Sequence, residues 1–203
     1  GIGEVIGLAV AALVLVLTLG SLIAAGLPLI TALVGVGIGV GGAYALSTAV
    51  EMNSATPVLG LMVGLAVGID YSLLVVTRFR EGLHAGRPVE DSVVMAVTTA
   101  GKSVIFAGVV VAIAFLGLFV MGLPFIAMLG TSGAIVVLLA VVVALTITPA
   151  LLSLVGHRID SWKVPFLHQT EGVDPSSLWY RLSRRIQRHP LPFALAAAGT
   201  LLV

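Results

Sequence analysis

The stretch that decides the fold is residues 57–78, which reads PVLGLMVGLAVGIDYSLLVVTR. At a rise of 1.5 Å per residue, a helix of about 20 apolar residues crosses the hydrocarbon layer of a membrane, and this stretch is long enough. Asp70 is its only charged residue before Arg78. We therefore expect a membrane-spanning helix with one acidic residue inside the hydrocarbon layer.

The whole chain has the composition of a membrane protein. Of its 203 residues, 59% are hydrophobic and 9% are charged, and the mean hydropathy is +1.20. Water-soluble domains carry about 25% charged residues, so a water-soluble fold is excluded. We predict an all-α membrane protein, a polytopic helical bundle with five complete transmembrane helices and the start of a sixth. The five spans are expected at residues 5–25, 27–47, 57–78, 103–121 and 125–149, and the sixth begins near Leu191.

Glycine and proline mark the expected turns. Residues 26–28 separate the first two spans and residues 122–124 the last two, because glycine interrupts a helix and proline begins one well. We expect a five-helix bundle over residues 1–155, a basic cytoplasmic loop with an amphipathic helix over residues 156–190, and a truncated helix start over residues 191–203. Because the chain begins without Met and ends inside an apolar run, we expect an internal piece of a longer protein.

The positive charges predict the orientation. All ten Lys and Arg lie in two segments, residues 78–102 and residues 158–188. Threading five spans through a membrane puts both segments on the same side, together with the first turn. Basic loops are retained in the cytoplasm, so we predict that this side is cytoplasmic and that Arg78, Arg80 and Lys102 are cytoplasmic anchors.

Two amphipathic helices are expected inside the basic segments. Pro88 begins the first, in which Val89, Val93 and Val97 share one face. This helix fits either the membrane surface or a solvated connector. Ser177 caps the second, which has Leu and Ile on one face and four arginines elsewhere. Such a helix is typical of the surface of an anionic membrane.

Asp70 is the residue most indicative of function. A carboxylate inside the hydrocarbon layer costs about 2.5–3.5 kcal/mol, and such residues face a bundle interior or a water-filled cavity and mark proton or substrate pathways. Arg78 lies about 12 Å further along the helix, too far to neutralise the carboxylate directly. Tyr71 follows directly and offers a hydroxyl group. The alternative is a structural carboxyl group held by hydrogen bonds from neighbouring helices.

Glycine stripes predict where the helices pack. Gly60, Gly64 and Gly68 recur every four residues, and Gly35 and Gly39 do the same in the preceding span. Small residues at this spacing let helix backbones approach closely in lipid. At 100° per residue, the acidic residue of this span falls about 120° from the centre of the first stripe. We therefore expect helix packing on the glycine face and a different partner for the carboxyl group.

Enzyme chemistry is not predicted. The chain has no cysteine, its four histidines are scattered through the loops, and no spacing matches a pair of metal ligands. No second acidic residue lies inside an expected span, so the paired acids of an intramembrane aspartyl protease are missing. We expect no cofactor, no bound metal and no nucleic-acid partner.

A family resemblance runs over nearly the whole chain. Residues 68–73, GIDYSL, and residues 77–81, TRFRE, resemble the fourth transmembrane helix of the MmpL (mycobacterial membrane protein large) transporters of the resistance–nodulation–division superfamily. Residues 24–28 are similar to the turn between helices two and three of that family. Residues 101–106 are similar to the beginning of its helix five, and residues 178–182 to the approach to its helix seven.

The resemblance implies helices two to six of a twelve-helix exporter in the plasma (inner) membrane of a bacterium. It implies that Asp70 and Tyr71 form part of a proton relay whose matching Asp-Tyr pair lies in a missing second half of the same polypeptide. The implied partners are the lipid bilayer, protons and a lipid or other hydrophobic substrate, as exported from actinobacteria. Ala107 departs from relatives that carry a hydroxyl residue near that point, so a hydrogen-bond partner for the relay is missing or supplied elsewhere.

Three functions remain open. The first is an exporter driven by the proton-motive force, in which protonation of Asp70 lets helices shift. The second is a protein-secretion accessory of the SecDF type, which would differ in its external domain. The third is a non-transporting, sterol-sensing-like membrane module, which shares the five-helix layout and predicts that Asp70 can be neutralised without loss of function.

Overall fold

The computed structural model describes residues 2–46, 55–162, 178–188 and 190–201. Contacts divide the chain into two compact units, Gly1–Leu167 and His168–Val203. The second unit contains two helices, α6 (Leu178–Arg188) and α7 (Pro190–Leu201). The expected cap of α6, Ser177, lies outside the described residues. The candidate site lies entirely in the first unit.

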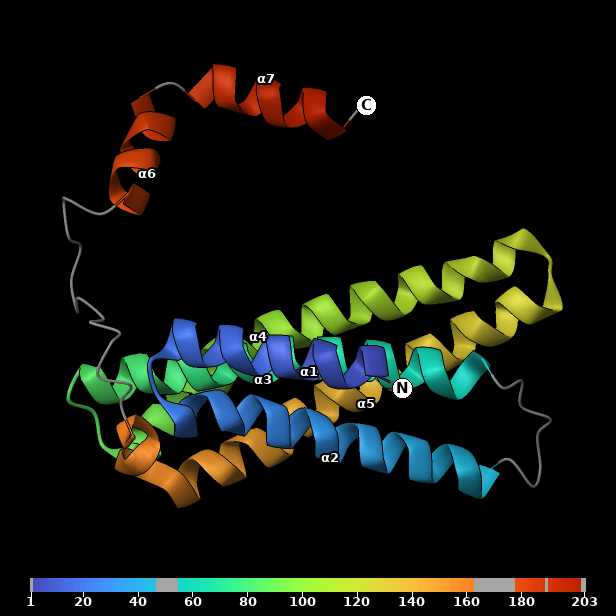
Figure 1. The fold of residues 1–203 in the computed structure, drawn as a ribbon, viewed down its shortest axis with the longest axis horizontal. Helices are drawn as coiled ribbons and strands as arrows, with labels where there is room; N and C mark the ends of the chain where they lie inside the picture. The colour runs from blue at the N-terminus through green and yellow to red at the C-terminus, as the bar shows by residue number, and fades with distance from the viewer. Residues whose placement is uncertain (1, 47–54, 163–177, 189, 202–203) are drawn as a thin grey trace. The chain divides into compact units, whose positions relative to one another are not determined.

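The first unit is a bundle of long helices that run alongside one another (Figure 1). These helices are α1 (Ile2–Leu19), α2 (Leu22–Leu46), α3 (Ala55–His84), α4 (Val89–Leu116) and α5 (Pro124–Val155). Short 3₁₀ turns follow α4 and α5, namely η1 (Gly117–Met121) and η2 (Gly156–Asp160). Helix α3 packs against α2, α4 and α5, and α5 packs against α2, α3 and α4, so these two helices form the centre of the bundle.

Four helices in the described residues are long and apolar enough to cross a membrane. Their candidate spans are Leu22–Gly39, Gly60–His84, Val89–Met121 and Pro124–Asp160. The apolar part of α1, Val5–Leu19, is shorter. The prediction of a polytopic helical membrane bundle is therefore confirmed. The predicted number of spans, five complete and the start of a sixth, is not confirmed.

The turn between the first two helices is not where the sequence predicted it. It lies at Gly20 and Ser21, and Pro28 is fully buried inside α2. Gly20 has a φ of 64°, a conformation that glycine adopts without a steric penalty. The Ser21 hydroxyl accepts a hydrogen bond from the Ala24 amide at 3.4 Å and so caps the start of α2. The prediction of a break at residues 26–28 was wrong, because neighbouring helices allow proline inside a membrane helix.

The connection between α3 and α4 is also shorter than predicted. The two helices are separated only by residues 85–88, and α4 runs without interruption from Val89. Gly82 lies against α4 so closely that a Cβ there would be 2.9 Å from the Ser92 hydroxyl oxygen. Ala96 and Ala100 are buried on the same side of α4. The helix predicted to begin at Pro88 is therefore present as the first turns of α4, and its small residues pack against α3.

The predicted break at residues 122–124 is confirmed. Gly122 has a φ of 68°, and Pro124 occupies the first turn of α5. Proline suits this position because the first amides of a helix have no partner within the helix.

The α1–α2 turn, the α3–α4 connection and η2 lie together at one end of the bundle, on the left in Figure 1. We call this end the Arg80 end. Its apolar core contains Phe79, Val76 and Ile159, all fully buried. The charge pattern predicted that these segments share one side of the membrane, and they do meet in the folded unit. The predicted basic loop after α5 therefore begins with a packed turn.

Candidate functional site

Asp70 lies near the middle of α3, about 20 Å from either end of the helix at 1.5 Å per residue. It is exposed in this unit, as is Ala66 one helical turn before it. The two mark a face of α3 that α2, α4 and α5 leave uncovered. A carboxyl group within a membrane-spanning helix is costly to leave against lipid.

Tyr71 occupies a different environment from its neighbour. It is half-buried and packs with Val104 of α4 and Ala144 of α5. A Cβ placed on Gly108 of α4 would lie 3.6 Å from Cε2 and 3.7 Å from the hydroxyl oxygen of Tyr71. The side chain of Tyr71 therefore packs against α4 and α5. The carboxyl group of Asp70, the preceding residue, lies on the uncovered face of α3.

Gly108 is the place where α4, α5 and the tyrosine meet. A Cβ at this position would overlap Cγ2 of Val141 on α5, so only glycine fits the present spacing. Ala107 precedes it and is half-buried. Ala107, which stands near the point where relatives are expected to carry a hydroxyl residue, is thus the neighbour of the glycine that borders Tyr71.

A buried hydroxyl pair lies beside the Asp-Tyr pair, and the sequence did not indicate it. The Thr148 hydroxyl of α5 donates a hydrogen bond of 3.3 Å to the Ser72 hydroxyl of α3. Both residues are fully buried. Ser72 directly follows Tyr71, so this bond joins α3 to α5 close to the candidate relay.

The glycine stripe of α3 faces α2 and α5. A Cβ on Gly64 would lie 3.1 Å from both Val36 of α2 and Val136 of α5. A Cβ on Gly68 would lie 3.2 Å from Cβ of Ala32. These distances are tighter than nearly all real Cβ contacts, so the missing side chains allow the close approach of three helices.

The remaining glycines of the predicted stripes differ in their contacts. A Cβ on Gly60 would be 3.4 Å from Val136, and one on Gly35 would be 3.3 Å from Val143, both on α5. Nothing lies within 4 Å of a Cβ on Gly39. Space for a side chain is therefore lacking at Gly35 but present at Gly39.

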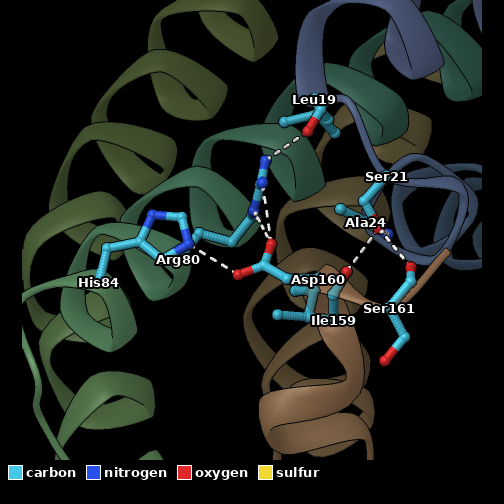
Figure 2. A network of polar contacts seen from close by, with 8 residues as sticks. All are labelled: Leu19, Ser21, Ala24, Arg80, His84, Ile159, Asp160 and Ser161. Carbon is cyan, nitrogen blue, oxygen red and sulfur yellow. Dashed lines mark hydrogen bonds and ion pairs between the residues drawn. The ribbon is translucent and has the colours of Figure 1, made fainter. Parts of the chain in front are cut away.

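A network of polar contacts joins three segments at the Arg80 end (Figure 2). Asp160 of η2 accepts hydrogen bonds from Nε of Arg80 at 2.9 Å and from Nε2 of His84 at 2.6 Å. A second guanidinium nitrogen of Arg80 lies 2.9 Å from the same carboxylate oxygen. The third nitrogen donates to the carbonyl oxygen of Leu19 at 2.9 Å. One arginine thus connects α3 to η2 and to the end of α1.

Ser21 adds a second connection in the same place. Its hydroxyl group donates to the carbonyl oxygens of Ile159 at 2.6 Å and Ser161 at 3.0 Å (Figure 2). The Leu22 amide lies 3.5 Å from the carbonyl oxygen of Trp162. Ser21 and Ile159 are fully buried, so the bond between them satisfies a hydroxyl group and a carbonyl group inside the bundle.

The sequence contained a signal for the arginine network. Arg80 and His84 are four residues apart and therefore share one face of a helix. Asp160 follows a span that ends on the same predicted side of the membrane. Pairing these three residues required knowing that α3 continues as a helix to His84.

The three predicted anchors have different surroundings. Arg80 is buried in the network described above. Arg78 is exposed and forms an ion pair of 2.7 Å with Glu81 of the same helix. Lys102 is exposed on α4, about 20 Å from the start of that helix at helical rise. It lies within a helix and not in a loop.

No metal centre is evident in the part of the chain that the structure describes. Its His, Asp and Glu residues form no group of three that could hold an ion. The three-residue network at Arg80 instead pairs one carboxylate with two nitrogen donors.

Comparisons with known proteins match nearly the whole chain. A family model described as "MMPL family" matches residues 1–193. Membrane protein YdfJ of Bacillus subtilis is 41% identical over 159 residues, which cover 78% of this chain and 22% of YdfJ.

Two exporters of mycobacteria are also similar. The mycolic acid-containing lipids exporter MmpL11 of Mycolicibacterium smegmatis is 34% identical over 193 residues, 94% of this chain and 20% of the exporter. The trehalose monomycolate exporter MmpL3 of Mycobacterium tuberculosis is 30% identical over 221 residues, 94% of this chain and 23% of the exporter. The chain therefore spans about a fifth of the length of these relatives.

Proposed function

Because the chain belongs to the MMPL family, we propose that it forms one membrane half of an exporter driven by the proton-motive force. It is a multi-pass membrane segment, and relatives are named as exporters of lipids. We propose that α1 to α5 all cross the membrane, that α7 begins the next span, and that a second half of the same polypeptide completes the bundle.

One observation carries this proposal. Asp70 lies near the middle of α3, one of the two central helices, on a face that the described helices leave open. A second membrane half would cover this face and bring its own Asp-Tyr pair opposite Asp70 and Tyr71. The carboxyl group would then lie in the bundle interior, where intramembrane acids act in proton transfer.

The proposed cycle uses the two environments of the Asp-Tyr pair. When Asp70 gains a proton it loses its charge, and its hydrogen bonds to the opposite half change. Tyr71 would stay lodged between α4 and α5 and transmit the change to those helices. Each charge that crosses the full field gains about 2.3 kcal/mol per 100 mV of membrane potential, which is available to move a lipid or another hydrophobic substrate outward.

The substitution Asp70→Asn tests the relay. In the full-length protein, reconstituted with the lipid extract of its host, we expect Asp70→Asn to abolish both proton uptake and lipid export, with insertion unchanged. Asp91→Asn is the matched control, since it removes an exposed acid from the first turn of α4 and should leave both activities intact. Export that survives Asp70→Asn would exclude the relay and favour a non-transporting module.

A further inference from the structure

The network at Arg80 lies on the same helix as Asp70, and apolar packing also holds this end of α3 in the bundle. Phe79 next to it is fully buried and supplies apolar packing at this end. The side chain of Arg80 is 11% exposed and that of Asp160 is 20% exposed. Burying such a pair is weak support for stability, because the loss of hydration offsets most of the attraction.

The network is, however, strongly directional. All three nitrogen atoms of the Arg80 guanidinium group are used, two by Asp160 and one by the carbonyl oxygen of Leu19. The guanidinium group is planar, so these bonds fix its orientation. His84, one turn later, binds the other oxygen of Asp160. Helix α3 therefore cannot rotate or slide at this end without breaking several bonds.

Ser21 adds directional hydrogen bonds between the α1–α2 turn and η2. Its hydroxyl group holds the α1–α2 turn to the backbone of η2. Asp160 is thus part of a short segment that is bonded to the α1–α2 turn, to the start of α2 and to α3, while Arg80 also binds the end of α1. Among the described residues, the beginning of α4 contacts this segment through apolar groups, with Val89 against Gly156, and the hydrogen bonds of the segment go to the other helices.

We propose that Arg80 and Asp160 are positioning residues for Asp70. They fix the end of α3 to η2 and to the α1–α2 turn, so that the height and rotation of the Asp70 carboxyl group are set from this end of the helix. A movement of α3 on proton binding is then passed to α1, α2 and η2. This inference rests on the proposed function of Asp70 as a protonated group.

The decisive variant replaces the ion pair by apolar residues, as Arg80→Met together with Asp160→Leu. Such replacements of partly buried ion pairs are often neutral or stabilising, so the fold is kept while the directional bonds are lost. The matched control is Arg78→Met together with Glu81→Leu. It makes the same chemical change on the same helix, but its ion pair lies within α3 and is exposed.

The readout is the labelling of Asp70 by dicyclohexylcarbodiimide, which modifies protonated carboxyl groups in apolar surroundings. Labelling of the full-length protein in vesicles is followed by mass spectrometry across a pH series. For the Arg80–Asp160 double variant, we expect the pH of half-labelling to shift by about half a unit or more, which is about a threefold change in the ratio of protonated to deprotonated carboxyl groups at a given pH. The control variant should keep the profile of the unmodified protein.

The outcomes separate the two proposals. An unchanged profile in a folded Arg80–Asp160 double variant overturns the positioning role and leaves the relay intact. Absence of Asp70 labelling in the unmodified protein at every pH overturns the relay itself. If the double variant is not recovered as a monodisperse protein, Arg80→Lys takes its place, because lysine keeps the charge but cannot make all the bonds of the guanidinium group. A profile of Arg80→Lys identical to the unmodified one would likewise overturn the proposal.

Discussion

The carboxylate of Asp160 and the guanidinium group of Arg80, eighty residues apart in the chain, are joined by two nitrogen–oxygen contacts of 2.9 Å. Breaking this pair from one side leaves a partly buried carboxylate with His84 as its remaining partner. The pair therefore allows a sharp comparison with the exposed ion pair of Arg78 on the same helix.

Arg80→Ala is expected to lower the free energy of unfolding by about 2–4 kcal/mol, since it leaves the Leu19 carbonyl without this donor and Asp160 with His84 alone. Arg78→Ala should cost less than about 1 kcal/mol, because its pair with Glu81 has side chains 49% and 58% exposed. Thermal unfolding of the full-length protein in detergent measures both. Equal losses would mean that the buried network contributes no more than the surface pair.

Gly64→Ala is expected to destabilise the bundle by about 1–3 kcal/mol, because the new methyl group must displace Val36 or Val136. Gly37→Ala is the control, since a Cβ there meets nothing within 4 Å. It should be neutral or stabilising by up to about 1 kcal/mol, because alanine favours the helix over glycine. The same unfolding assay applies, and a loss at Gly37 as large as at Gly64 would contradict the packing argument.

Gly108→Ala is expected to reduce transport, because its methyl group overlaps Val141 and must push α4 from α5 beside Tyr71. Adding Val141→Ala removes the overlapping atom and leaves the new methyl group at ordinary contact distance from Tyr71. The double variant should therefore recover most of the proton uptake measured in vesicles. Failure of Val141→Ala to restore any activity would exclude helix spacing as the cause.

Ser21→Ala is expected to cost about 1–3 kcal/mol of unfolding free energy, because the buried Ile159 carbonyl and the Ala24 amide lose their bonds to this hydroxyl group. Ser153→Ala serves for comparison. Its hydroxyl group is exposed and bonds only to carbonyl oxygens of its own helix, so its loss should stay within about 0.5 kcal/mol. A larger effect at Ser153 than at Ser21 would contradict the role given to the turn.

The sequence predicted the class of fold because membrane helices need long apolar runs. It also predicted the break at Gly122, where glycine in a left-handed conformation precedes a proline that begins a helix. It failed at Pro28, because proline signals a helix start in water but is tolerated inside a helix that neighbours surround. Local signals do not contain the tertiary contacts that decide between these two cases.

The candidate site was predictable only where a single residue carried the signal. Asp70 is evident as the one acid in an apolar span. The packing of Tyr71 against Gly108 and the bond between Thr148 and Ser72 depend on the spacing of three helices. The pairing of Arg80 with Asp160 depends on a different property, because the two residues meet only if α3 continues as a helix to His84.

The open face around Asp70 also matters for the synthesis of the protein. A chain translated only through α5 would hold a carboxyl group at a depth where lipid exposure costs about 2.5–3.5 kcal/mol. Under the proposed function, that cost would persist until the second membrane half covers the residue, so an unfinished or truncated product would differ chemically from a mature one. Membrane quality-control proteases that recognise polar groups in the bilayer could then use the exposed Asp70 carboxyl group to select incomplete chains for degradation.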